Sequence, residues 1–314
     1  MGLDSPMVTV LMPVYDGGCF LSPAVDSVLG QGFRDFEFVI VDDGSTDGSA
    51  RLLASLGDPR VRVLSQTNGG MSSALNAGLR AARGELVARM DQDDLALPGR
   101  LQQQVDFLRH HPDVALVGTR FVTLDEAGAT GEVADVLLGP DELRRDLFVR
   151  CPLAHGTVMA RRAVLDALGG YDGSKWPAED YDLWHRLMQS HRAANLPEVL
   201  YAYRIYARNR YSARDAAMER QVQAEVWNGN PPRLTRRTAR ADVSRYRAAT
   251  APSDDLVSAY VVQHWKLLLL LLARRRWREA AALSHVLLLA PLLAPRLRHR
   301  ARSIVRKMSW NRWR

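Results

Sequence analysis

Two clusters of acidic residues in this chain have a spacing that could do chemistry. The first is RMDQDD (89–94), where three carboxylates follow the mostly apolar run ELVARM (85–90). Because carboxylates this close repel one another, a cation, hydrogen bonds or solvent must relieve the repulsion. Alternation at a strand end puts Asp91 and Asp93 on the same side, and Mg2+ or Mn2+ commonly takes one or two such carboxylates together with substrate phosphates. The alternative is a turn whose acids precede a helix, and we expect that structural role for Asp94.

The second cluster is AEDYDLW (178–184), at the start of a helix predicted over 177–191. The macrodipole stabilises acids at a helix N-terminus, so capping is one interpretation of Glu179 and Asp180. The other is a general base that takes a proton from an attacking hydroxyl. Adjacent helical positions diverge by about 100°, so the two carboxylates should not share one role. Trp176, just before them, could form a wall that stacks on a sugar.

Cys151 and His155 raise the question of a metal site or a nucleophile. Their C-x-x-x-H spacing has no second pair and matches no zinc pattern, and a Cys–His nucleophile stays open only as a minor alternative. With Cys19 as the one other cysteine, there is no disulfide framework, and a reducing compartment is favoured. The first residues have no basic n-region and no long apolar h-region, so we expect a cytoplasmic protein.

The first hundred residues alternate between strand and helix patterns. Units of roughly 25–30 residues indicate right-handed βαβ crossovers and a parallel sheet, and continuous apolar strands indicate burial on both faces. The expected strands and helices are MVTVLMPV (7–14), the helix over 21–31, FEFVIV (36–41), VRVL (61–64), the helix over 71–82, and ELVARM.

Polar and glycine residues gather where these strands end. They are Tyr15, Asp42 and Asp43, Asn68-Gly69-Gly70, and the DQD acids. In open α/β sheets, ligands bind in the crevice outside the carboxyl ends of the strands. The chain has neither G-x-G-x-x-G after the first strand nor G-x-x-x-x-G-K-[ST]. A bound nucleotide's phosphates would therefore need another counter-charge, and a divalent metal held by DQD is the candidate.

The later sequence is less regular. A helix over 97–111, a strand over 114–124 and a closing strand over 198–206 are expected, and the composition becomes polar and Arg-rich from about Ala207. We predict one domain and one extension, with the following bounds: a domain over 1–206, made of a nucleotide-binding half (1–112) and an acceptor-binding half (113–206), and a helical, basic C-terminal extension (207–314).

The end of the extension is strongly basic. Residues 256–314 hold eleven Arg and two Lys against one acid, Glu279, so the rest of the chain is net negative although the whole chain is +7. Leucine runs beside Arg and Trp are typical of helices on an anionic membrane surface, which would put the protein on the cytoplasmic face. The alternative is a helical subdomain packed on the core. The apolar content is too high for a nucleic-acid-binding arm, so no nucleic-acid partner is expected.

Three stretches together resemble the family 2 glycosyltransferases. They run from VTVLMPVYDGG to VDDGSTDGS, from NGGMSSALNAG to RMDQDD, and over GGYDGSKWPAEDYDLWHRL, and the resemblance covers about 8–206. It implies the GT-A fold, a Rossmann-like and mostly parallel sheet flanked by helices. It also implies transfer of a sugar from a nucleotide-sugar, usually a UDP-sugar, to a hydroxyl of a glycan or lipid-linked acceptor. The transfer would invert the anomeric carbon and use Mg2+ or Mn2+.

The resemblance implies roles for the residues at the strand ends. Pro13 and Tyr15 would contact the uracil, and Asp42 would accept a hydrogen bond from the base. Asp91 would lie near the ribose and the metal, and Asp93 would be the direct metal ligand.

The resemblance also implies roles in the acceptor-binding half. Asp180 would be the catalytic base, and Glu179 would orient the acceptor. Trp176 and His155 are further candidates for acceptor contacts.

Two departures from the family pattern bear on the phosphates. Many relatives have a His after the closing strand, where this chain has Tyr206, so Arg204, Arg208 or Arg210 could serve the phosphates instead. The TNGGMSS loop also lacks the basic residue that some relatives have there.

Two rival functions remain. A nucleotidyltransferase would also use a parallel sheet and a metal, but it should carry a basic Gly-rich loop after the first strand, and YDGGCF has no Lys or Arg. A non-catalytic nucleotide-sugar-binding protein would need the strand-end residues but not the Glu179–Asp180 pair.

Overall fold

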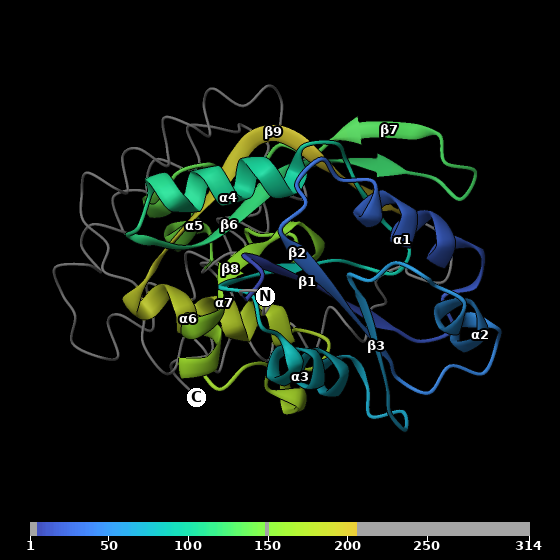
Figure 1. The fold of residues 1–314 in the computed structure, drawn as a ribbon. Coiled ribbons are helices and arrows are strands. Elements are labelled where there is room, and N and C mark those ends of the chain that lie inside the picture. Colours follow the sequence, from blue (N-terminus) through green and yellow to red (C-terminus); the bar gives the residue numbers. More distant parts are fainter. Residues whose placement is uncertain (1–4, 148–150, 206–314) are drawn as a thin grey trace, which may run out of the picture. The chain divides into compact units, whose positions relative to one another are not determined.

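The computed structural model of the chain describes residues 5–147 and 151–205. The predicted extension over 207–314 lies outside these residues, so both interpretations of it stay predictions. Within the described ranges, no helix is both long enough and apolar enough to cross a bilayer. One nine-stranded sheet runs through the described residues and is flanked by helices (Figure 1). The predicted α/β class is therefore confirmed.

The first half of the chain forms a wholly parallel part of the sheet. Its strands, in spatial order, are β3 (Val61–Ser65), β2 (Phe36–Asp42), β1 (Val8–Val14) and β4 (Leu86–Arg89). The helices between them are η1 (Gly18–Phe20), α1 (Leu21–Leu29), α2 (Ser49–Ala54) and α3 (Met71–Ala81). Every residue of β1 and β2 is buried, as their apolar runs predict. A Cβ at Gly78 of α3 would collide with Leu11, so this helix lies directly against β1.

The second half makes the sheet mixed. Beyond β4 the spatial order continues with β8 (Met159–Arg161), β6 (Val114–Leu124), β9 (Arg192–Arg204) and β5 (Leu95–Ala96), and β7 (Thr130–Val133) pairs with β6. β8 is antiparallel to β4 and β6, whereas β6 and β9 are parallel. The helices here are α4 (Arg100–His110), α5 (Pro140–Asp146), η2 (His155–Thr157), α6 (Arg162–Ala167), η3 (Gly173–Lys175) and α7 (Glu179–Ser190).

The closing strand begins earlier than its sequence indicates. The apolar run predicted a strand over 198–206, but β9 already pairs with β6 from Arg192 onward. The sequence gives no strand signal for this part of β9, because it contains Arg192 and Pro197 and neither residue type favours a central strand. The register between β6 and β9 shifts at Thr119–Arg120, opposite this irregular stretch.

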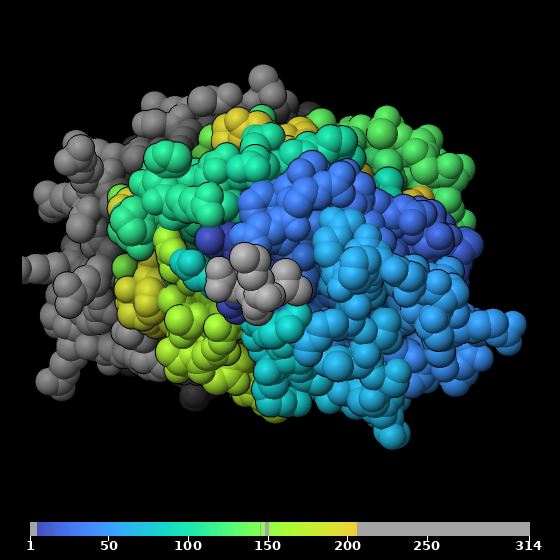
Figure 2. All heavy atoms as spheres, in the orientation of Figure 1, coloured from blue at the N-terminus to red at the C-terminus, as the bar shows by residue number. Residues whose placement is uncertain are grey.

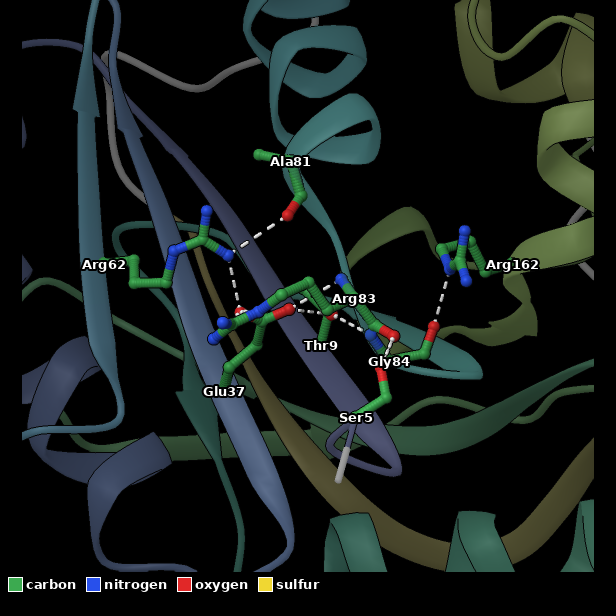
Figure 3. Close-up of polar contacts among 8 residues, drawn as sticks. All are labelled: Ser5, Thr9, Glu37, Arg62, Ala81, Arg83, Gly84 and Arg162. Atoms are coloured by element: carbon green, nitrogen blue, oxygen red, sulfur yellow. Dashed lines mark hydrogen bonds and ion pairs between the residues drawn. The ribbon is translucent and has the colours of Figure 1, made fainter. Parts of the chain in front are cut away.

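A fully paired polar cluster lies at the amino ends of the parallel strands (Figure 3). We call Thr9, Glu37, Arg62 and Arg83 the amino-edge cluster. Glu37 is 3% exposed and accepts hydrogen bonds from the Thr9 hydroxyl (2.8 Å), Arg62 (2.7 Å) and both the backbone and side chain of Arg83 (2.7 and 2.9 Å). Burial raises the pKa of Glu37, but these donors outweigh it and lower the pKa below its usual value. The cluster joins β1, β2, β3 and the segment after α3.

Candidate active site

At the carboxyl edge, the ends of β1 and β4 are joined through the middle residue of DQD. The side-chain oxygen of Gln92 accepts from the backbone N–H of Tyr15 (2.9 Å), and its Nε2 donates to the Tyr15 carbonyl (3.0 Å). The Tyr15 side chain is 45% exposed. Pro13 lies buried in β1, opposite Val41 of β2. Of the two predicted uracil contacts, only Tyr15 presents its side chain to solvent.

The two acids that follow β2 have different environments. Asp43 accepts from the backbone N–H groups of Gly69 and Gly70 (2.9 and 2.8 Å) and from Gln66 (2.6 Å). It thereby fixes the loop that leads into α3. Asp42 accepts from the backbone N–H of Ser45 (2.9 Å) through one oxygen, Oδ1. Because Asp43 binds the protein's own loop, Asp42 is the better candidate of the pair for a ligand contact.

The three acids of RMDQDD also have different environments. Asp94 is 1% exposed and accepts from the backbone N–H of Arg204 (2.7 Å). Burial, and then the charge of Asp93, raises the pKa of Asp94 to about 7. Asp91 and Asp93 are both partly exposed. Asp94 therefore ties the turn to β9, while the other two carboxylates border the solvent-accessible edge.

Two buried side chains hold Asp91. The Arg89 guanidinium forms an ion pair with Oδ2 of Asp91, and Arg89 is only 4% exposed. The hydroxyl of Tyr201 accepts from the backbone N–H of Asp91 (3.2 Å) and donates to the same Oδ2 (3.5 Å). Burial keeps the pKa of Tyr201 well above its usual value, so its hydroxyl stays a donor.

Helix α4 fixes the strand end beneath these groups. Nη2 of the buried Arg100 donates to the carbonyls of Arg89 (2.6 Å) and Gly156 (2.8 Å), and Gln104 donates to the carbonyl of Thr157 (2.8 Å). Burial lowers the pKa of Arg100 to about 10, so it stays charged at neutral pH. These bonds hold η2 beside the end of β4.

The two acids of the second cluster begin α7 and differ in exposure. Glu179 is 6% exposed, and its Oε2 has no hydrogen-bond partner among the described residues. Burial raises the pKa of Glu179 above its usual value. Asp180 is partly exposed, and the thiol of Cys151 lies 3.9 Å from its Oδ2. The pair thus provides one enclosed carboxylate and one that solvent reaches.

The GGYDG segment is attached to the first half of the chain by Asn76 of α3. The side-chain amide of Asn76 donates to the carbonyl of Tyr171 (2.8 Å), and its oxygen accepts from the Tyr171 N–H (2.9 Å). Gly170 has a φ of 70°, and a Cβ there would collide with the Asn76 oxygen. On the face drawn in Figure 2, the surface of α3 adjoins that of the later, yellow-green part of the chain. These bonds therefore join α3 of the first half to the segment that leads into α7.

The two further acceptor candidates differ in how they are held. Nε2 of His155 lies 2.9 Å from the hydroxyl oxygen of Tyr171, and the imidazole ring packs edge-on against Trp184. Burial holds the pKa of His155 well below its usual value, so the ring is neutral. Trp176 is 53% exposed. Of the two, Trp176 is the more exposed and so the better candidate to stack on a sugar.

Comparison with known proteins identifies the family. The model of Glycosyl transferase family 2 matches residues 9–169, more than half of the chain. The chain belongs to this family. It is a glycosyltransferase, as the motifs predicted.

Two curated relatives of this glycosyltransferase come from bacteria. The putative glycosyltransferase EpsE of Bacillus subtilis is 35% identical over 209 residues, covering 64% of this chain and 74% of the relative. The O-antigen biosynthesis glycosyltransferase WbnJ of Escherichia coli is 32% identical over 208 residues, covering 64% and 80%.

Solved structures share the fold of this glycosyltransferase. S. aureus TarS (residues 1–349), in complex with UDP-GlcNAc, has a TM-score of 0.61 at 18% identity and covers 90% of each chain. The mannosyltransferase PcManGT of Pyrobaculum calidifontis, in complex with GDP-Man and Mn2+, has a TM-score of 0.53 at 20% identity and covers 98% of this chain and 81% of that one. The likeness establishes a GT-A-like fold.

The carboxylates of the glycosyltransferase fit a metal that needs substrate oxygens. Among the described residues, no group of three or more His, Cys, Asp and Glu side chains could hold a metal alone. Asp91 and Asp93 are both partly exposed at one strand end. Two carboxylates completed by phosphate oxygens are a common donor set for Mg2+ and Mn2+, so this pair fits either ion.

Arg204, whose sequence position made it a candidate to bind the phosphates, is held by the protein itself. It is 5% exposed, and its guanidinium donates to the carbonyls of Asp93 and Asp125 (2.8 Å each) and lies over the ring of Phe20. It therefore stabilises the turn. Arg208 and Arg210, which are also candidates for the phosphates, and Tyr206 at the family's His position lie outside the described residues.

Four residues that build the site were missed by the sequence interpretation. A signal existed for Arg89, which is a charge inside an apolar strand run and therefore calls for a buried partner. Tyr201 shares the alternating run LYAYR with apolar neighbours, which indicates only burial. Gln92 and Asn76 gave no signal, because their partners are backbone groups far away in the sequence.

Proposed function

We propose that this glycosyltransferase transfers a sugar from a nucleotide-sugar to an acceptor hydroxyl by a single displacement, with inversion. The observation that supports the proposal is that η2 lies against both Asp91, after β4, and α7, whose first residues are Glu179 and Asp180. UDP is the nucleotide we favour, and TarS, a structural neighbour, binds UDP-GlcNAc.

The donor side is formed by the strand ends of the first half. Tyr15 offers an exposed ring to stack on the uracil. The second carboxylate oxygen of Asp42 can accept a hydrogen bond from an N–H of the uracil, because only Oδ1 is bonded to Ser45. Asp93 and Asp91 would hold the Mg2+ or Mn2+ ion together with the diphosphate. Bound there, the ion supplies Lewis-acid neutralisation of the diphosphate leaving group. PcManGT, another neighbour in fold, binds Mn2+.

The acceptor side is formed by α7. Asp180 takes the proton from the attacking hydroxyl as the carbon–oxygen bond to the sugar forms, and the bond to the diphosphate breaks on the opposite face. Partial exposure of Asp180 supports this role, because an acceptor must reach the base from solvent. Glu179, Trp176 and His155 orient the acceptor and the sugar.

The acceptor we favour is a growing surface glycan or a lipid-linked sugar. WbnJ, a relative, is an O-antigen biosynthesis enzyme. Attachment of the basic extension (207–314) to the cytoplasmic membrane surface would bring the domain to such acceptors. Liposome flotation of the full-length chain, compared with residues 1–255, tests whether the extension binds the membrane. Equal flotation of the two would refute membrane binding by the extension.

The deciding experiment is a screen of UDP-, GDP- and dTDP-sugars for hydrolysis and transfer with Mn2+ or Mg2+. We expect one nucleotide class to be turned over, and Asp93→Ala to abolish the stimulation by metal. Calorimetry of UDP with Mn2+ supplies a second readout, in which Asp93→Ala should lose the dependence of UDP affinity on metal.

The screen also separates the rivals. Binding of a nucleotide-sugar without turnover on any acceptor would favour a binding protein over an enzyme. Release of pyrophosphate from a nucleoside triphosphate and a sugar phosphate would favour a nucleotidyltransferase.

A further inference from the structure

Several buried polar groups at the carboxyl edge lack partners within the described part of the chain. They are Nε of Arg89, Oε2 of Glu179, Oγ of Ser72 and Nε1 of Trp184. Native proteins leave few buried polar atoms unpaired, because each unpaired atom is destabilising. Arg60 and Arg120 keep such atoms in other parts of the described chain, but Arg89 and Glu179 are two of opposite charge, a combination to which a ligand can supply the missing partners.

These groups come from elements that meet beneath the DQD turn. Arg89 ends β4, and its Nη2 lies 3.9 Å from the sulfur of Met71 in the first turn of α3. Glu179 begins α7. The short helix η2 lies between the two elements: a Cβ at Gly156 would collide with Oδ2 of Asp91, the atom that Arg89 binds, and the ring of His155 packs edge-on against Trp184 of α7.

We propose that Arg89 and Glu179 bind one hydroxyl of the sugar being transferred. The hydroxyl oxygen accepts from the Arg89 guanidinium, and its O–H donates to Oε2 of Glu179. This subsite rests on the proposed function, since it names a contact of the donor sugar within that site.

The chemistry of the pair selects a hydroxyl. A hydroxyl both accepts and donates, whereas Glu179 would repel a carboxylate and Arg89 would repel an ammonium group. Arg89 and Glu179 are 4% and 6% exposed, so only a small projecting group reaches both.

The position of Arg89 selects the donor sugar over the acceptor. Arg89 is the last residue of β4, two positions before Asp91, and the two side chains form an ion pair. The subsite therefore adjoins the diphosphate end of the nucleotide, to which the transferred sugar is attached. The acceptor enters at the more exposed Asp180 instead.

The test measures binding of monodeoxy donors to the full-length chain by calorimetry. The probes are UDP, the UDP-sugar that the screen identifies, and its monodeoxy analogues, each with Mn2+. In the wild-type protein we expect one analogue to bind about 10- to 100-fold more weakly than the parent donor, the effect of losing a charge-assisted hydrogen bond.

Variants assign that loss to the pair. In Glu179→Gln the monodeoxy donor should bind only about threefold or less more weakly than the parent donor, because one hydrogen bond to the hydroxyl is already weakened. The affinity for UDP should stay as in the wild type. Arg89→Lys should also reduce the loss, because an ammonium group cannot reproduce the geometry of the guanidinium. Asp182→Asn is the matched control, a buried acid on the same helix that is already paired with Arg186 (2.8 Å). In Asp182→Asn the monodeoxy donor should bind as much more weakly than the parent donor as it does in the wild type.

Three results would overturn the subsite. One is a monodeoxy penalty that is unchanged in Glu179→Gln. Another is an equal weakening of UDP and UDP-sugar by Arg89→Lys, which would mean that Arg89 acts only through Asp91. The third, binding of no nucleotide or nucleotide-sugar by the wild type, would remove the proposed function itself. If Arg89→Lys melts early and cannot be assayed, Glu179→Gln decides alone.

Discussion

The amino and carboxyl edges of the parallel strands each bury a glutamate, but only the glutamate of the amino-edge cluster is fully paired. Glu37 and Glu179 have nearly the same exposure, 3% and 6%. Both oxygens of Glu37 accept hydrogen bonds from Thr9, Arg62 and Arg83. Glu179 keeps an oxygen that has no hydrogen-bond partner among the described residues.

Pairing, more than burial, separates the two carboxylates. Burial raises the pKa of both, but the arginines of the amino-edge cluster reverse the effect for Glu37 and leave its pKa lowered. The pKa of Glu179 stays raised. Removing a buried acid from its partners destabilises the fold. A buried acid without a partner and with a shifted pKa is instead typical of a ligand-binding or catalytic site. The comparison therefore predicts that substitutions at the two edges will have opposite consequences.

The largest effect should come from Asp180→Asn at the carboxyl edge. Loss of a general base lowers kcat by about 10²–10⁴-fold, and a partly exposed side chain contributes little to packing. We expect the melting temperature to stay unchanged while sugar transfer nearly stops. Transfer by Asp180→Asn at the wild-type rate would remove Asp180 from the mechanism.

Glu37→Gln should have the reverse effect. It breaks the amino-edge cluster and leaves two arginines without their carboxylate, which destabilises the fold by about 2 kcal/mol. This is less than for a fully buried pair, because the side chains of Arg62 and Arg83 are 35% and 58% exposed and can hydrate. Urea denaturation measures the change, and kcat of the folded fraction should match the wild type. A large loss of kcat at full stability would contradict the comparison.

Glu179→Gln should lower activity yet raise stability at neutral pH by about 1 kcal/mol, since an amide is easier to bury than an unpaired charge. The folded-state pKa of Glu179 is raised, so the wild type loses stability as pH rises above the ordinary glutamate pKa of 4.5. The advantage of the variant should therefore vanish below about pH 4. Thermal melts between pH 4 and 8 measure it, and a variant less stable at every pH would show that Glu179 is structurally paired.

The smallest effect should come from Asp58 in the turn before β3. It accepts from Nη2 of Arg60 (2.7 Å), which lowers the pKa of Asp58 to about 2. A lowered carboxyl pKa adds stability that is complete above pH 4 and lost as the pH falls to about 2. Asp58→Asn should cost about 1 kcal/mol or less at pH 7, because solvent screens the pair. The difference between variant and wild type should close at pH 2, and a constant difference would exclude the ion pair as its cause.

Much of the first half could be predicted because its signals are local. The strands before Tyr15, Asp42 and Asp91 follow from apolar runs ended by turn formers, and their shared edge follows from βαβ handedness. The motifs also identified the family correctly. The roles of the individual site residues stay predictions.

The second half was harder because its pairing is long-range. β8 has three residues and β5 has two, and strands this short carry no periodicity. The start of β9 is concealed by Arg192 and Pro197, and only its pairing with β6 makes it a strand. Arg204 was a candidate for the phosphates because it lies beside the family's His position. Its carbonyl partners are distant in the sequence, and only the fold brings them to it.

By itself, the sequence determined which elements form, which side chains end the strands, and to which family the chain belongs. Spacing and residue type are properties of neighbouring positions, and they suffice for these conclusions. Only the tertiary structure decided which buried charges are paired. Arg62 finds Glu37 across two strands and Arg100 binds two distant carbonyls, whereas Arg89 and Glu179 each keep an atom that no described residue pairs. Pairing depends on what the fold brings together from far along the chain, because the partners lie on different strands and helices.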